Sequence, residues 1–298
     1  MYLKPATCNL KLVTQKHQQS PMEKRAYYYL VSGLPTLIFE QAKPPFSMLA
    51  FREELQYHLH PADYRQVLYL FLPADNRNLL HILQKDTGHW DEQGQYTEEQ
   101  LEAFVREPET APAYMRRFIE AYQQEAPLAA GMSWENQLTQ LYYDSVLEQT
   151  AEGFLFDWFS FERDIHNLKA AFTARRYQLS QQGQLIGDYR LTEAARNSNA
   201  RDFGLSGEYP FINRLLMLEE EPELLEREEE TDILRWNYID ELNTFNYFTI
   251  EVLLGYLLKL SILERWSILG PEEGLEAFRG LVRRLEQSFE FPKAFSVS

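Results

Sequence analysis

The sequence predicts an all-α, or nearly all-α, protein, and three observations support this prediction. Apolar residues recur at spacings of three and four in several long segments, which is the period of a helix and not of a strand. Glycine and proline are scarce, at 13 and 14 of 298 residues, so a β fold with many turns is disfavoured. Hydrophobic residues make up 45% of the chain, which is enough for a sizeable core.

The N-terminal 21 residues are polar and unpatterned, and we expect residues 1–21 to be a disordered extension before a helical body over 22–298. Residues 27–35 combine aromatic and β-branched residues with a closing Gly and Pro. That composition predicts either one short N-terminal strand with a turn or the beginning of a helix. The single cysteine, Cys8, excludes an internal disulfide and a cysteine-rich zinc site.

From Ser47 onward the pattern is helical. Thr97 and Gln100 have the spacing of a capping box, which predicts the start of a helix. Pro112 stands where another helix could begin. The clearest apolar stripe predicts a helix of about five turns, because its members are four or three residues apart. It consists of Phe154, Trp158, Phe161, Ile165, Leu168 and Phe172.

The last third of the chain predicts two more helices. Residues 245–266 are apolar on nearly all sides, as in a helix at the centre of a bundle. After Gly270-Pro271 a second clean stripe follows, formed by Leu275, Phe278, Val282, Leu285 and Phe289. Residues 183–207 are polar and interrupted by glycines, which indicates a boundary. The expected sub-units of the body are approximately 22–130, 131–190 and 191–298.

The charge balance restricts the partners. With 29 Lys+Arg and 45 Asp+Glu the net charge is −16, which disfavours nucleic acid and anionic membrane surfaces. The most apolar stretch, 249–263, contains Glu251 and Lys259, so we expect a soluble protein with no direct membrane insertion. The glutamate-rich block between Glu219 and Asp232 predicts a solvated helix face or a loop.

No motif points to an enzyme. The six histidines lack the spacing of a helical zinc site and are predicted to be surface or cap residues. There is no P-loop and no nucleophile elbow. Helices can bring distant carboxylates together, but nothing singles out such a pair. We therefore expect no catalytic residue, no metal ligand and no cofactor.

One short pattern recurs. Asp75-x-x-Asn78 and Asp164-x-x-Asn167 both open an apolar helical run, and Asp240-x-x-Asn243 is a fainter third copy. An Asp three residues before an Asn places both side chains on one helical face, where they can tie a helix to its neighbour. The hypothesis is a repeated helical unit.

The segment 161–177 resembles a signature of the central-stalk C (or d) subunit of archaeal and vacuolar-type ATPases. That family carries Asp-x-x-Asn-Leu-Lys, then apolar residues, then a basic cluster. The matching residues here are Asp164, Asn167, Leu168, Lys169, Arg175 and Arg176. Residues 134–152 look like the helix before that motif. The chain departs from the family at Thr173, where an arginine is usual, and Arg175 or Arg176 would take its place.

Residues 27–35 and 263–266 are also similar to an uncharacterised bacterial family, mainly from Bacteroidetes, that is encoded beside V-type ATPase genes. This second resemblance spans 22–292. Together the resemblances imply an all-helical funnel of three similar domains.

The function that the resemblances imply is that of a non-catalytic central-stalk subunit, which couples the rotor shaft to the membrane ring in ion transport. Its partners would be the shaft subunits D and F and the c-ring, on the cytoplasmic, inner face of the plasma membrane. Candidate partner-binding residues are Glu219, Glu220, Glu221, Glu223, Glu226, Glu228, Glu229 and Glu230. The alternative is a free-standing helical scaffold or adaptor, unrelated to rotary ATPases.

Overall fold

All regular secondary structure in the described part of the chain is helical, which confirms the all-α prediction. The computed structural model describes residues 25–268 apart from 40, 42, 86, 87, 89 and 151. Two predictions lie outside these residues: the disordered extension 1–21 and the apolar stripe 275–289. The division of the body into three sub-units stays a prediction.

The described helices follow one another through short connections, listed here in chain order. They are α1 (Tyr28–Gly33), α2 (Met48–His58), α3 (Pro61–Leu68), α4 (Leu72–Gln84), α5 (Glu98–Arg106), the 3-10 helix η1 (Pro108–Thr110), α6 (Ala113–Gln123), α7 (Trp134–Thr150), α8 (Phe154–Arg176), α9 (Arg190–Asn197), α10 (Ile212–Glu220), α11 (Leu224–Leu242) and α12 (Ile250–Ile268).

Several helix boundaries follow the local chemistry of the sequence. Thr97 caps α5, and its side chain and that of Gln100 form the reciprocal hydrogen bonds of a capping box. Pro112 directly precedes α6. His60 caps α3, because its Nδ1 accepts a hydrogen bond from the backbone N–H of Ala62. All six residues of the predicted α8 stripe are buried.

Two expectations about the ends of elements were wrong. Residues 28–33 form the short helix α1, so the alternative of an N-terminal strand does not hold; this turn of helix directs Leu30 into the core. The apolar helix begins at Ile250 and not at Phe245, which is 87% exposed. Residues 243–249 are needed for the turn that reverses the chain between α11 and α12.

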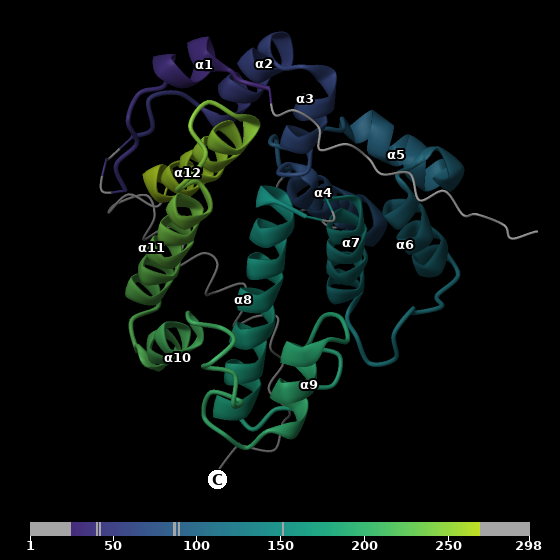
Figure 1. The fold of residues 1–298 in the computed structure, drawn as a ribbon. Helices are drawn as coiled ribbons and strands as arrows, with labels where there is room; N and C mark the ends of the chain where they lie inside the picture. The colour runs from purple at the N-terminus through teal and green to yellow at the C-terminus, as the bar shows by residue number, and fades with distance from the viewer. Residues whose placement is uncertain are drawn as a thin grey trace, which may run out of the picture.

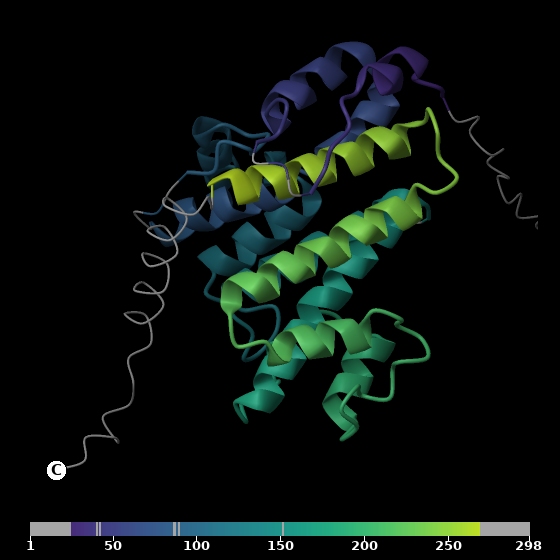
Figure 2. The ribbon, with the colours of Figure 1, turned by 90° about the vertical axis from the view of Figure 1, so that its left-hand side faces the viewer.

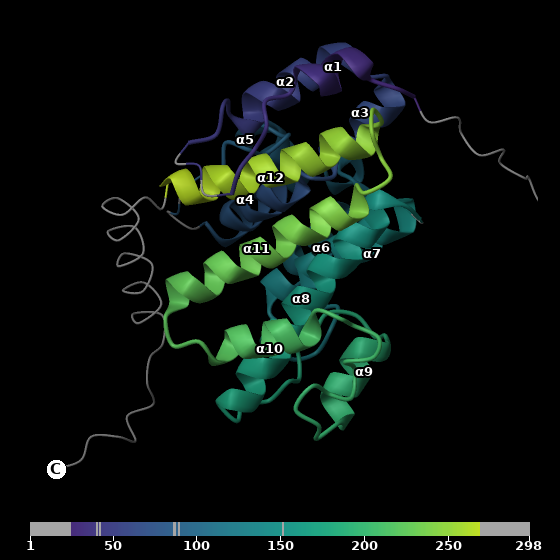
Figure 3. The same cartoon turned by 60° about the vertical axis from the view of Figure 1, so that its left-hand side comes forward.

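Helix α8 runs through the middle of the fold (Figure 1), with α7 packed along one side and α10 and α11 on the other. Helices α11 and α12 form an antiparallel hairpin, and α2 lies against α12 (Figures 2 and 3). Helices α9 and α10 both pack on the C-terminal half of α8. The longest helix is therefore surrounded by elements from both halves of the chain.

The described residues enclose two hydrophobic cores. The larger core takes residues from α1 to α8 and from α11 and α12, and the smaller one lies between α8, α9 and α10. Helix α8 contributes Phe154 to Ile165 to the large core and Leu168 to Phe172 to the small one. The polar segment 183–207 is consequently not a linker, because Leu185, Ile186 and Leu205 are buried.

Candidate functional site

The first Asp-x-x-Asn motif holds the loop that follows its helix. Asn78 exchanges two hydrogen bonds with the backbone of Asp91: its Nδ2 donates to the carbonyl at 2.9 Å, and its Oδ1 accepts from the N–H at 2.8 Å. Asp75 Oδ1 accepts from the backbone N–H groups of Gln95 at 2.7 Å and Tyr96 at 3.0 Å. One turn of α4 thus fixes the loop that leads to α5.

The second motif does the same work on α8. Asn167 Nδ2 donates to the carbonyl of Ile186 at 2.9 Å, and the N–H of Ile186 donates to Asn167 Oδ1 at 2.7 Å. Asp164 accepts a hydrogen bond of 2.6 Å from the hydroxyl of Tyr189, the residue that precedes α9. Each motif therefore ties its helix to the next loop, and each loop ends in the cap of a short helix.

The third copy of the motif differs. Asp240 forms an ion pair with Lys259 at 2.5 Å. Asn243 lies against α12 at Gly255, where an added Cβ would be 2.2 Å from the Asn243 Nδ2. This pair ties the two helices of a hairpin together, so only the first two copies share one geometry. A Cβ at Gly94 would meet Asp75 Oδ1 at 2.8 Å, which shows how closely the first loop approaches its helix.

Burial raises the pKa of both motif aspartates to about 6, against hydrogen bonds that favour the charged carboxylate. The ordinary value is 3.8, so between about pH 4 and pH 6 the folded chain holds protons that the unfolded chain has released. The folded state is therefore favoured below pH 4, and this advantage is lost as the pH rises through 6.

We expect Asp75→Asn to remove this pH dependence. Raising the pH from 4 to 7 should increase the stability of the variant relative to the natural chain by about 2 kcal/mol, since one pKa unit corresponds to about 1.4 kcal/mol. Urea unfolding at pH 4, 5, 6 and 7 measures the difference, and Asp164→Asn should show the same trend. A difference that does not vary with pH would contradict the assignment.

The rest of the α8 motif also holds other segments. Leu168 is fully buried in the smaller core. Lys169 Nζ donates to Glu228 Oε1 of α11 at 2.7 Å. Arg175 donates to the carbonyls of Ala200 at 2.6 Å and Ser198 at 2.8 Å, and Arg176 donates to that of Glu219 at 2.7 Å. The basic cluster therefore fastens the α9–α10 connection and the end of α10.

An ion-pair network joins α8, α11 and α12. Arg235 Nε donates to Glu162 Oε1 at 2.8 Å, and Arg235 Nη1 donates to Asp232 Oδ1 at 2.9 Å. Asp232, which is 1% exposed, also accepts from Arg265 and, at 2.8 Å, from the indole N–H of Trp266. The sequence patterns gave no indication of Asp232 or Arg235.

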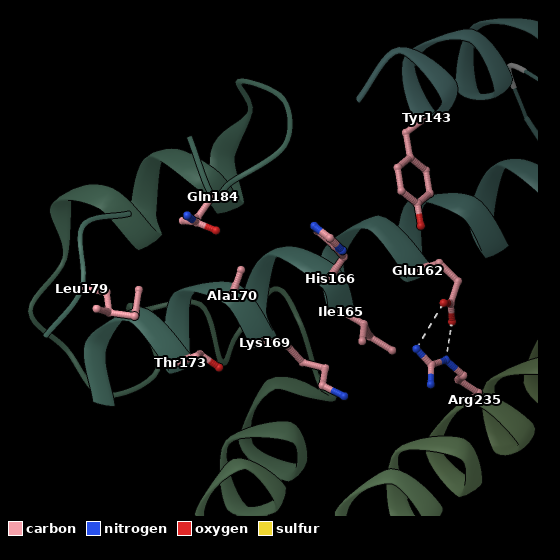
Figure 4. Close-up of a pocket in the computed structure, with 11 residues that line it drawn as sticks. Tyr143, Glu162, Ile165, His166, Lys169, Ala170, Thr173, Leu179, Gln184 and Arg235 are labelled. Carbon is pink, nitrogen blue, oxygen red and sulfur yellow. Dashed lines mark hydrogen bonds and ion pairs between the residues drawn. The ribbon is translucent and has the colours of Figure 1, made fainter. Parts of the chain in front are cut away.

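A groove runs along α8 beside this network, with a volume of about 610 Å³ (Figure 4). The α8 groove comprises the face of α8 from Glu162 to Ala174, together with Tyr143 of α7, Leu179 and Gln184 of the next loop, and Arg235 of α11. His166 is on this face, and burial lowers the pKa of its imidazole. Burial also raises the pKa of the Tyr143 hydroxyl, and the nearby Glu162 carboxylate adds to the shift.

The glutamate block proves to be two kinds of residue. Four members form ion pairs within the chain: Glu219 with Arg227, Glu220 with Arg201, Glu228 with Lys169, and Glu230 with Arg214. Glu221 is partly buried in the turn before α11, and its carboxylate accepts a hydrogen bond from the backbone N–H of Glu223 at 3.4 Å. The other three, Glu223, Glu226 and Glu229, are exposed and form no ion pair with a described residue. These three are named the acidic face here.

Two searches of the described residues returned nothing. No group of three or more His, Cys, Asp or Glu side chains in them is placed to hold a metal ion. Among residues 25–268, with the gaps given above, no helix is sufficiently long and apolar to cross a membrane.

These features describe an all-helical protein whose buried charges and amides hold its own segments together. The chain belongs to the family described as "Protein of unknown function (DUF2764)", which matches residues 22–289. No curated protein and no solved structure matches the chain.

Proposed function

We propose that this chain is a non-catalytic central-stalk subunit of a V-type ATPase, coupling the rotor shaft to the membrane ring. The observation that carries the proposal is the use of the motif on α8. Every polar residue of the segment that resembles the stalk family binds a different loop or helix, through Asp164, Asn167, Lys169, Arg175 and Arg176. A subunit that transmits rotation needs such cross-braced helices, because close-packed interiors transmit strain.

The acidic face is the proposed contact with the partners, which are the shaft subunits D and F and the c-ring. Its three carboxylates begin α11 and point to solvent, while their neighbours are neutralised within the chain. Exposed unpaired charge steers association and adds to affinity when the partner surface is basic. The protein would act at the inner face of the plasma membrane, docked on the ring without inserting into the bilayer.

We expect the chain to co-purify with the shaft and ring subunits at low salt. Replacing Glu223, Glu226 and Glu229 together by glutamine should weaken this binding about tenfold, since each exposed ion pair contributes on the order of 0.5 kcal/mol. Glutamine preserves the size of the side chains, and the loss should shrink as salt is added. A pull-down titrated with salt measures both effects.

A matched control is the triple substitution of Glu107, Glu109 and Glu120 by glutamine. These residues are also exposed but lie around η1 and at the end of α6. The control removes the same charge and should leave binding unchanged. Absence of co-purification at low salt would contradict the proposed function, and equal losses in both variants would contradict the assigned surface.

The alternative function is a helical scaffold or adaptor outside rotary ATPases. A specific observation favours it: a second exposed surface of aromatic residues is formed by α1 and the turn between α11 and α12. Its members are Tyr28, Tyr29, Phe245, Tyr247 and Phe248. Aromatic residues are enriched at protein interfaces. Co-purification with proteins other than the ATPase subunits would favour this alternative.

A further inference from the structure

The last described helix ends beside the α8 groove. Arg265 and Trp266, in the final turn of α12, both donate to Asp232. Asp232 is bonded to Arg235, which forms one wall of the groove. The chain therefore leaves Ile268 two contacts away from the groove, with 30 residues still to follow.

The floor of the groove suits an apolar helix. Ile165, Ala170 and Ala174 of α8 and Leu179 of the next loop line it, and Leu179 is 59% exposed. The small alanine side chains leave room for larger side chains to enter. From Glu162 to Ala174 the groove extends along α8 for about 18 Å, at 1.5 Å per residue.

The remaining chain contains a segment of matching length and character. Leu275, Phe278, Val282, Leu285 and Phe289 repeat at spacings of three and four. As a helix this stripe would be about 21 Å long. The six residues 269–274 can span up to about 20 Å, so the stripe can reach any part of the groove. The family match extends to residue 289, so the stripe belongs to the shared part of the chain.

We propose that the C-terminal segment 275–289 binds as a helix in the α8 groove of its own chain, with its apolar stripe against Ile165, Ala170, Ala174 and Leu179. An exposed apolar groove and an unpaired apolar stripe are both unfavourable in water, and their contact removes both. The segment then covers His166 and Lys169 and braces α8 on its remaining open side. The inference is independent of the proposed ATPase function.

Site-specific photocrosslinking of the isolated chain tests the proposal. A benzophenone amino acid replaces Thr173, which is exposed and lines the groove. After irradiation, mass spectrometry should identify adducts to peptides from 275–289 of the same chain. The same probe at Tyr57 of α2, a residue 85% exposed, is the control position and should give no such adduct.

A pair of variants separates the stripe from its polar face. Phe278→Glu with Val282→Glu should reduce the adduct at least tenfold. Arg279→Glu with Arg283→Glu changes two positions off the stripe and should preserve it. Adducts between two chains would assign the groove to a second copy, and adducts only to added ATPase subunits would assign it to them. Either of these outcomes, or no adduct from Thr173, would overturn the proposal.

Discussion

Replacing Asp232 by alanine is expected to lower the free energy of unfolding by about 3 kcal/mol. The carboxylate is 1% exposed and accepts hydrogen bonds from Arg235, Arg265 and Trp266. Removing one partner of a buried ion pair costs about 3–5 kcal/mol, because the opposite charge remains without its compensation. Arg265 can turn to solvent and Arg235 keeps Glu162, which places the effect at the lower end of that range.

Asp240→Ala is the matched control, since Asp240 also lies on α11 and pairs with a lysine of α12. Its side chain is 61% exposed, so we expect a loss of under about 1 kcal/mol. Urea unfolding at pH 7 gives both values, and hydrogen exchange should show faster opening of the end of α12 in the Asp232 variant alone. Equal losses in the two variants would show that Asp232 does not hold α12.

Asn167→Ala is expected to lower the free energy of unfolding by about 3 kcal/mol. The change removes two hydrogen bonds to the backbone of Ile186, which is fully buried. A buried polar group that loses its partner costs about 1–3 kcal/mol, and here both an N–H and a carbonyl are affected. The loop between α8 and α9 should detach first, with faster amide exchange at residues 185–191.

Asn197→Ala provides the comparison for this prediction. Asn197 is exposed at the end of α9, and its side chain bonds only the carbonyl of Glu193 in its own helix. We expect a change of less than about 0.5 kcal/mol. Asn78→Ala should resemble Asn167→Ala, because Asn78 holds Asp91 in the same two-bond arrangement. A mild effect at Asn167 with a full effect at Asn78 would show that the two motifs are not equivalent.

Helices whose burial repeats locally could be predicted from the sequence. The α8 stripe and the capping box of α5 depend on residues three or four positions apart, so nearby sequence determines them. The strand alternative for 27–35 was wrong, because composition does not reveal that Leu30 packs into the core as part of a helical turn. The early start assigned to α12 was wrong because apolar content alone cannot distinguish a helix from the turn before it.

The candidate site was only partly accessible to sequence reasoning. The residues of the α8 motif were identified, but their partners are distant: Lys169 and Glu228 are 59 positions apart. Tyr189, Asp232 and Arg235 were missed for the same reason. One signal was present: Glu162, Lys169 and Arg176 follow one another every seven residues, and Glu228 and Arg235 repeat the interval on α11. Antiparallel helices with matched seven-residue intervals can pair opposite charges in series.

The passage of α8 through both hydrophobic cores limits how the protein can be divided. A fragment that ends before Phe154 would leave the large core without the side chains from Phe154 to Ile165. A fragment that begins after Arg176 would lose Leu168, Ala171 and Phe172 from the small one. Neither piece could bury its apolar surface alone, so the two halves of the chain must be synthesised, folded and degraded as one unit.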